Sequence, residues 1–129
     1  MLELACQYAA QKPVQLRSIA QRHGIPARFL VQILLQLKAA GLVNSTRGAA
    51  GGYRLARDPA QVTLRDVTQI LDGQPATITS KAENATSIST TLIDMFNHFR
   101  SQQSKMLQTI TLAELMQRAE QDTNPMYYI

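Results

Sequence analysis

The chain has 129 residues, of which 45% are hydrophobic, and its 13 Lys and Arg outnumber its 9 Asp and Glu. This length corresponds to one domain with at most an added oligomerisation arm. No apolar run reaches the roughly 20 residues of a membrane helix, the start is too polar for a signal peptide, and a single cysteine excludes an internal disulfide framework, so we expect a cytoplasmic protein.

The positive charge is concentrated in the first half of the chain. From Lys12 to Arg57 there are eight Lys or Arg and no Asp or Glu, whereas residues 74–129 hold four basic and five acidic side chains. A solvated surface normally mixes both signs, so an acid-free stretch of this length indicates a polyanionic partner, most simply double-stranded DNA. The alternative is a basic surface without a partner.

Three helices are predicted at the start of the chain, over residues 2–11, residues 15–24 and residues 26–40. Gly24 and Gly41 suit the ends of the last two, because glycine adopts the left-handed conformation of a helix C-terminus. Two short helices joined by a glycine-containing turn make a helix-turn-helix. Apolar residues at helical spacing would face its core: Leu16, Ile19, Ala20, Leu30, Ile33, Leu34 and Leu37.

The outward face of the third helix carries candidate DNA contacts. Arg28, Gln32 and Gln36 are four residues apart, and Phe29 lies beside them near the start of the helix. Long cations and amides at the start of the second helix of such a unit read base edges in the major groove. The alternative is a solvated face that reads nothing.

The segment RGAAGGYRLARDP, residues 47–59, contains three of the six glycines and three arginines. It connects two predicted strands, one opening at Leu42-Val43 and one over Tyr53-Arg54-Leu55-Ala56, which together make a wing. We expect Gly48, Gly51 and Gly52 to bring the backbone close to DNA, where a side chain would clash. Arg47, at the start of the turn, would enter the minor groove.

The second half is predicted as three helices and a loop. Thr63 and Asp66 have the spacing of a capping box at the start of one helix, which Gly73 ends. Residues 74–87 form a polar loop, and a long helix covers residues 87–109 before a last short helix. An apolar stripe with heptad-like spacing on the long helix predicts pairing with a second subunit, and the alternative is that it packs on its own domain. The stripe consists of Ile88, Leu92, Met95, Phe99 and Met106.

The sequence of residues 13–73 resembles the Rrf-type, IscR-like family of bacterial winged-helix transcription regulators. The resemblance lies in the Ile-Ala helix, the Gly-Ile turn, the Gly-Leu-Val strand and the wing RGAAGGYRLA, and it extends loosely to ITLAEL near residue 110. It implies a mainly α fold in three parts. These are a winged helix-turn-helix DNA-binding domain (1–73), a loop (74–87), and a dimerisation helix with a C-terminal helix and tail (88–129).

The resemblance also implies how DNA would be bound. It implies a homodimer whose recognition helices enter successive major grooves of a near-palindromic site. By position, Arg28, Phe29 and Gln32 would face the groove, and Arg47 and Gly48 would lie at the wing. On the preceding helix, Ser18 and Gln21 would contact phosphates.

Two departures from the family concern its cofactor and its start. The family's better-known members hold an iron–sulfur cluster through three cysteines in the loop before the long helix and a nearby non-cysteine ligand. Residues 74–87 contain no cysteine here, and Ile93 stands where a ligand histidine would fall. Because thiolates hold such clusters, we expect no iron–sulfur cluster and no metal site. Members usually also have a basic segment before the position of Met1, so the resemblance implies either a trimmed start or weaker DNA binding.

The lone cysteine and the two histidines are not expected to be ligands. Cys6 has apolar helical neighbours, so we expect a buried small hydrophobe, with a redox role as the alternative. His23 and His98 are single histidines on helices. A switching signal would therefore come from a regulatory partner protein, from a small ligand between the wing domain and the long helix, or from oxidation of Cys6.

These features predict a sequence-specific DNA-binding transcription regulator, most simply a repressor that occupies a promoter. The alternative is a winged-helix module whose basic face binds an acidic protein or RNA. We do not expect an enzyme, because the sequence holds no nucleophile–base pair, clustered carboxylates or metal-ligand spacing, and GAAGG lacks the lysine of a phosphate-binding loop.

Overall fold

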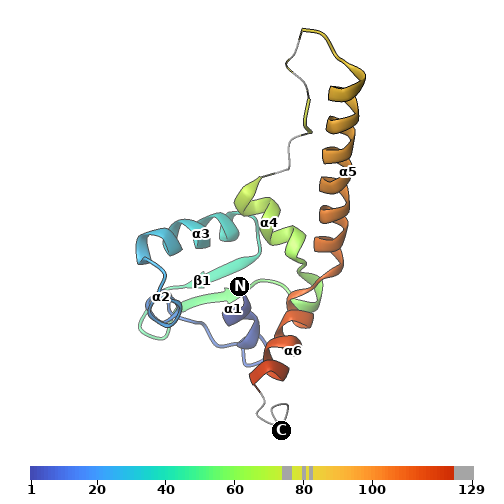
Figure 1. The fold of residues 1–129 in the computed structure, drawn as a ribbon. Coiled ribbons are helices and arrows are strands. Elements are labelled where there is room, and N and C mark those ends of the chain that lie inside the picture. Colours follow the sequence, from blue (N-terminus) through green and yellow to red (C-terminus); the bar gives the residue numbers. More distant parts are fainter. Residues whose placement is uncertain (74–76, 80, 82, 124–129) are drawn as a thin grey trace.

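The computed structural model describes residues 1–73, 77–79, 81 and 83–123. These residues form a mainly α fold with a two-stranded wing, as predicted (Figure 1). In chain order the elements are α1 (Leu2–Cys6), α2 (Leu16–His23), α3 (Ala27–Ala39), β1 (Val43–Thr46), β2 (Gly52–Leu55), the 3-10 helix η1 (Pro59–Gln61), α4 (Leu64–Asp72), α5 (Ser87–Thr109) and α6 (Leu112–Thr123).

Capping residues set two of the predicted helix boundaries. Gly24 ends α2 in the left-handed conformation, with φ 63°. At the start of α4 the Asp66 N–H donates to the Thr63 hydroxyl at 3.1 Å, and the Thr63 N–H donates to the Asp66 carboxylate at 3.0 Å. This reciprocal pair satisfies two backbone donors that the start of a helix leaves unpaired. Both predicted boundaries are confirmed.

The first helix is shorter than predicted. α1 ends at Cys6, and residues 7–11 form turns in which Gln11 takes a positive φ of 56°. Leu4 and Ala5 are the buried residues of α1, whereas Cys6 is exposed. The prediction that Cys6 is a buried hydrophobe is therefore wrong, because so short a helix turns only a narrow face toward the core.

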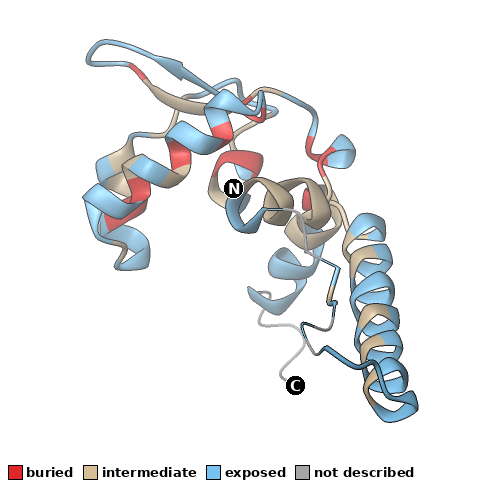
Figure 2. Ribbon diagram, turned by 90° about the horizontal axis from the view of Figure 1, so that it is seen from above, coloured by how far each residue is buried: buried red, intermediate tan, exposed pale blue. Residues whose placement is uncertain are grey.

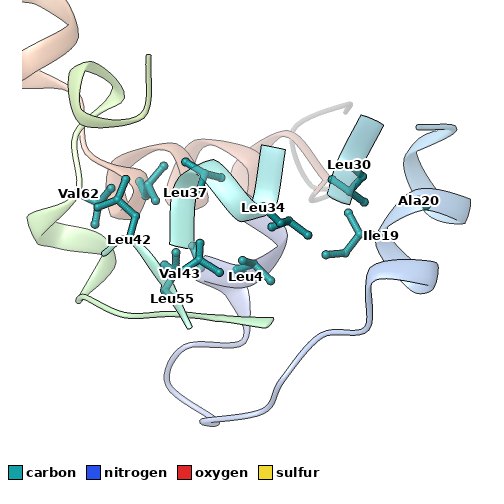
Figure 3. Packing of buried hydrophobic residues seen from close by; sticks show 12 residues of the cluster. Leu4, Ile19, Ala20, Leu30, Leu34, Leu37, Leu42, Val43, Leu55 and Val62 are labelled. Atoms are coloured by element: carbon teal, nitrogen blue, oxygen red, sulfur yellow. The ribbon is translucent and has the colours of Figure 1, made fainter. Parts of the chain in front are cut away.

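One hydrophobic core joins the helix-turn-helix, the wing and α6. At its centre lies the inward face of α3, where Leu30, Leu34 and Leu37 are buried (Figure 3). Burying one leucine side chain contributes about 1.5–3 kcal/mol, so this face fixes the rotation of α3 about its own axis. The other core residues come from α1, α2, the two strands, α6 and the segments next to the strands and η1: Leu4, Ala5, Ile19, Ala20, Leu42, Val43, Leu55, Val62 and Leu112.

The long helix projects from this core, and the last helix returns to it. α5 packs along α4 and extends away from the wing domain (Figures 1 and 2). α6 packs against α1 and η1, and its Leu112 is buried in the common core. The sequence analysis grouped this C-terminal helix with the dimerisation helix. In the structure α6 packs into the same core as residues 1–73. Within the described ranges, no helix combines the length and apolarity needed to cross a membrane.

The wing is an antiparallel hairpin in which Val43 pairs with Leu55 and Thr46 with Gly52. A third segment joins it, because Val14 and Tyr53 exchange backbone hydrogen bonds of 2.9 and 2.8 Å. The chain just before α2 is therefore tied directly to the second strand of the wing. The hairpin itself was predicted from the alternating pattern, whereas the bridge to Val14 was not.

Two of the three wing glycines make room for the protein's own backbone. A Cβ on Gly51 would lie 2.1 Å from the Thr46 carbonyl oxygen, and a Cβ on Gly52 would lie 2.5 Å from the Val14 carbonyl oxygen. Gly48 differs, because it is exposed, has φ 107° and would place a Cβ in open space. Gly51 and Gly52 therefore have a role inside the protein, because their missing side chains admit β1 and the Val14 segment. Their approach to DNA stays a prediction.

Gly51→Ala should lower the free energy of unfolding by about 3 kcal/mol, because the methyl group overlaps backbone that cannot move by itself. Gly41→Ala is the matched control: Gly41 has φ 79° and nothing within 4 Å of its Cβ position, so only the conformational cost of about 1–2 kcal/mol applies. Urea unfolding followed by circular dichroism measures both values. Equal losses in the two variants would contradict the steric explanation.

Candidate nucleic-acid interface

The face of α3 opposite the core is open to solvent. Arg28, Gln32 and Gln36 are exposed, and Phe29 is 61% exposed. Because Leu30, Leu34 and Leu37 point inward, the helical repeat leaves these four side chains on the outer side. A cation, an amide and an exposed aromatic ring at the start of a helix match the groups that contact guanine, adenine and the thymine methyl group in the major groove.

The wing presents a second cation at its tip. Arg47 and Gly48 are both exposed. Neither Arg28 nor Arg47 has a hydrogen-bond or ion-pair partner among the residues that the structure describes. Figures 1 and 2 show the start of α3 and the tip of the wing at the end of the domain remote from α5. Two unpaired guanidinium groups at one end of the domain form a surface suited to phosphate or base edges.

Three contacts hold the wing against the helix-turn-helix, and sequence patterns did not indicate them. The Gln15 amide donates to the Ala49 carbonyl at 3.2 Å, which links the start of α2 to the tip of the wing. Lys38 Nζ donates to the Ser45 hydroxyl at 2.6 Å, which links the end of α3 to β1. The third contact is the Val14–Tyr53 bridge described above. Each joins positions distant in sequence, which local periodicity does not reveal.

The remaining basic side chains of the acid-free stretch differ in exposure and in their partners. Arg54 is half-buried, and its Nη1 donates to the Gln11 carbonyl at 3.5 Å. Lys12, Arg17 and Arg57 are exposed. Arg22 forms an ion pair with Glu3, and His23 Nε2 lies 3.0 Å from the other oxygen of that carboxylate. α1 thus brings an acidic residue from outside the stretch back to α2 and offsets part of its positive charge.

The two α2 residues named as phosphate contacts differ in exposure. Ser18 is half-buried, whereas Gln21 is exposed. Both lie on α2, which contacts α3. Their role in DNA binding remains a prediction.

The apolar stripe of α5 lies on the surface of the protein. Its five residues are between 50% and 74% exposed, and Phe96 next to them is also exposed. α5 packs on α4 through a different face. The alternative that the stripe packs on its own domain is therefore wrong, and the exposed stripe is available to a second subunit.

The described residues offer few donors for a transition metal. No group of three His, Cys, Asp or Glu within the described ranges is arranged to hold a metal ion. Cys6, the one cysteine of the chain, is exposed on α1, and His98 is exposed on α5.

Comparison with known proteins places this arrangement in a family. The model of the Rrf2 family, described as iron-dependent transcriptional regulators, matches residues 1–118. The protein rrf2 of Nitratidesulfovibrio vulgaris is 31% identical over 125 residues, which cover 92% of this chain and 81% of that protein.

Solved structures of two regulators are similar over nearly the whole chain. CymR, the global cysteine regulator of B. subtilis, has a TM-score of 0.76 and 31% identity, covering 91% of this chain and 87% of its own. IscR of T. potens has a TM-score of 0.76 and 32% identity, covering 98% of this chain and 87% of its own.

Proposed function

This chain belongs to the Rrf2 family of transcriptional regulators, and we propose that it binds a near-palindromic DNA site as a homodimer and represses transcription by occupying that site. The observation that carries the proposal is the pair of unpartnered guanidinium groups, Arg28 on α3 and Arg47 on the wing. With Gln32 and Phe29 they supply base contacts, while Lys12, Arg17 and Arg57 supply phosphate contacts around them. A chromosomal target implies action in the bacterial cytoplasm.

The wing is proposed to follow the DNA backbone next to the groove that α3 enters. Gly48 supports this role because its exposed backbone has no side chain to hold DNA away from the tip. Ser18 and Gln21 are proposed to contact phosphates from α2. Gly51, Gly52 and Tyr53 contribute indirectly, since Gly51 lets the turn close against Thr46 while Gly52 and Tyr53 hold the wing against the Val14 segment.

The homodimer is proposed to form through α5. An isolated helix with five large apolar side chains along one side would leave a hydrophobic band in water, and a second copy of the same helix covers such a band in register. A two-fold dimer would present two α3 helices to successive major grooves, which is why a near-palindromic site is expected.

The iron named in the family description is not expected here as a thiolate-held cluster. Such clusters need several cysteine thiolates, and a homodimer of this chain supplies two, one exposed Cys6 on each α1. The loop before α5 contains no cysteine. We therefore propose regulation by a different signal.

Gln32→Ala should lower the preference for the specific site over random duplex by about 5- to 150-fold, because one lost base contact costs about 1–3 kcal/mol. Arg57→Ala should weaken binding to all sequences alike and reduce the salt dependence by about one counterion. Fluorescence anisotropy at several salt concentrations, with a duplex selected from a random pool, measures both effects. Gln61→Ala, at an exposed glutamine of η1, is the control that should change neither.

Two outcomes would contradict the DNA-binding proposal. One is an equal loss of specific and random binding in the Gln32 and Arg57 variants. The other is that no duplex is retained while a salt-resistant complex forms with an acidic protein or with RNA.

The double variant Leu92→Glu, Phe99→Glu should convert the dimer to a monomer, because two charges per subunit would be buried at the helix pair. Sedimentation velocity measures the change, and circular dichroism checks that the fold persists. Thr90→Glu places the same charge on an exposed position on the opposite side of α5 and should leave the dimer intact. A dimer that survives the double variant would place the subunit contact elsewhere.

Protein purified without oxygen should show no visible absorption bands beyond those of the polypeptide, because one thiol per chain does not hold an iron–sulfur cluster. The measurement is an anaerobic absorption spectrum with an iron and sulfide assay on the same sample. Stoichiometric iron and sulfide with visible bands would overturn this prediction.

A further inference from the structure

Figure 1 shows α4 packed against α5, and a polar cavity lies between these two helices. It has a volume of about 420 Å³ and is lined by α4, by Thr77 and by the second half of α5. Three lining residues are cations, Arg65, Arg100 and Lys105, and none of the described lining residues is acidic. Thr77 and Ser104 contribute hydroxyl groups. The volume falls in the range of small-molecule sites.

Arg65 is the lining residue of this cavity that most favours an anionic ligand. Its Nη1 donates to the Gln108 side-chain oxygen at 2.8 Å, which orients the guanidinium group across the gap between the helices. Its Nε is buried and has no hydrogen-bond partner among the residues that the structure describes. An unsatisfied buried donor on a charged group is costly, and an anion in the adjoining cavity would offset the positive charge of this guanidinium group. The adjoining cavity of about 310 Å³ shares Arg65 and includes Asp72, so the acid-free side is the better anion site.

The wall formed by the loop is held in place by Asn97. The Ile78 N–H donates to the Asn97 side-chain oxygen at 3.0 Å, and the Asn97 amide donates to the Ile78 carbonyl at 3.2 Å. This two-way contact, from a half-buried asparagine to the backbone, fixes residues 77–79 against the middle of α5. Thr77 is thereby kept at the cavity, and the site is formed before any ligand binds.

The cavity lies on the side of α5 opposite the apolar stripe. Asn97, Ser101, Ser104 and Gln108 follow the helical repeat at spacings of four and three, about half a turn away from the stripe residues. A second subunit that covers the stripe would leave this side accessible. The site therefore remains open in the proposed dimer.

We propose that this cavity binds a small anion that carries a carboxylate or phosphate group, with Arg65 and Lys105 as its main charge partners. α4 also contacts α3. A ligand that bridges α4 and α5 would therefore affect the position of α3, the helix proposed to contact DNA. Its action as an effector rests on the proposed function. The binding itself does not.

Isothermal titration calorimetry on the full chain without DNA tests the site, with inorganic phosphate and citrate as probes at constant ionic strength. One probe should bind with one site per chain, and which one binds distinguishes a phosphate from a carboxylate ligand. Lys105→Gln should weaken binding about tenfold or more, and Arg65→Lys should do so as well because it keeps the charge but removes the planar guanidinium group with its several donors. Lys81→Gln, an exposed lysine that does not line the cavity, is the charge-matched control and should bind as the native chain does.

Three results would overturn the site: no heat with either probe, unchanged binding in both cavity variants, or equal weakening in Lys81→Gln, which would indicate an adventitious ion only. The effector role is tested separately by repeating the anisotropy titration with the bound probe. A change in DNA affinity that Lys105→Gln removes supports it. Anion binding with unchanged DNA affinity overturns the effector role, whereas absence of DNA binding in any condition overturns the proposed function.

Discussion

The burial of one side of α3 is the constraint on which the rest of this structure depends. Leu30, Leu34 and Leu37 occupy the centre of a small core that also takes residues from α1, α2, the wing and α6. Rotating α3 by half a turn would expose three leucines and bury Arg28 and Gln32, at a cost of several kcal/mol for the apolar surface and more for the charge. The core thus determines which side chains the helix offers to a partner.

The rotation of α3 about its axis does not determine the position of Arg47. That position depends on the backbone of the wing. Gly52 lets Tyr53 pair with Val14, and Gly51 lets the turn close against Thr46. The wing is therefore joined to the segment before α2 as well as to the end of α3, through Lys38 and Ser45. Glycines in a basic turn suggest close approach to DNA, but two of these three are needed for close approach within the protein. Arg47 owes its position to that internal contact.

The parts of this protein that the sequence predicted are those governed by local chemistry. The leucine spacing of α3, the Thr63–Asp66 cap and the alternating pattern of the wing each depend on residues within a few positions of one another, and all appear in the structure. The failures are of a different kind. The short α1 and the exposed Cys6 depend on how far the first helix reaches into a core built by distant residues. The Gln15–Ala49 contact and the Arg65–Gln108 hydrogen bond likewise join elements that no periodicity relates.

Backbone hydrogen bonds at the base of α5 join this helix to the rest of the protein. The Leu64 N–H donates to the Ile110 carbonyl at 2.9 Å, and the Leu112 N–H donates to the Val62 carbonyl at 2.9 Å, so short backbone pairs tie the start of α4 to the end of α5. With 23 residues, α5 is about 34 Å long, and a small tilt at this base moves its far end by several ångströms. Leu112 anchors the same junction in the core. A contact that shifts α4 relative to α5 therefore acts at this junction. In a dimer formed through α5, the same junction would determine the spacing of the two DNA-binding domains.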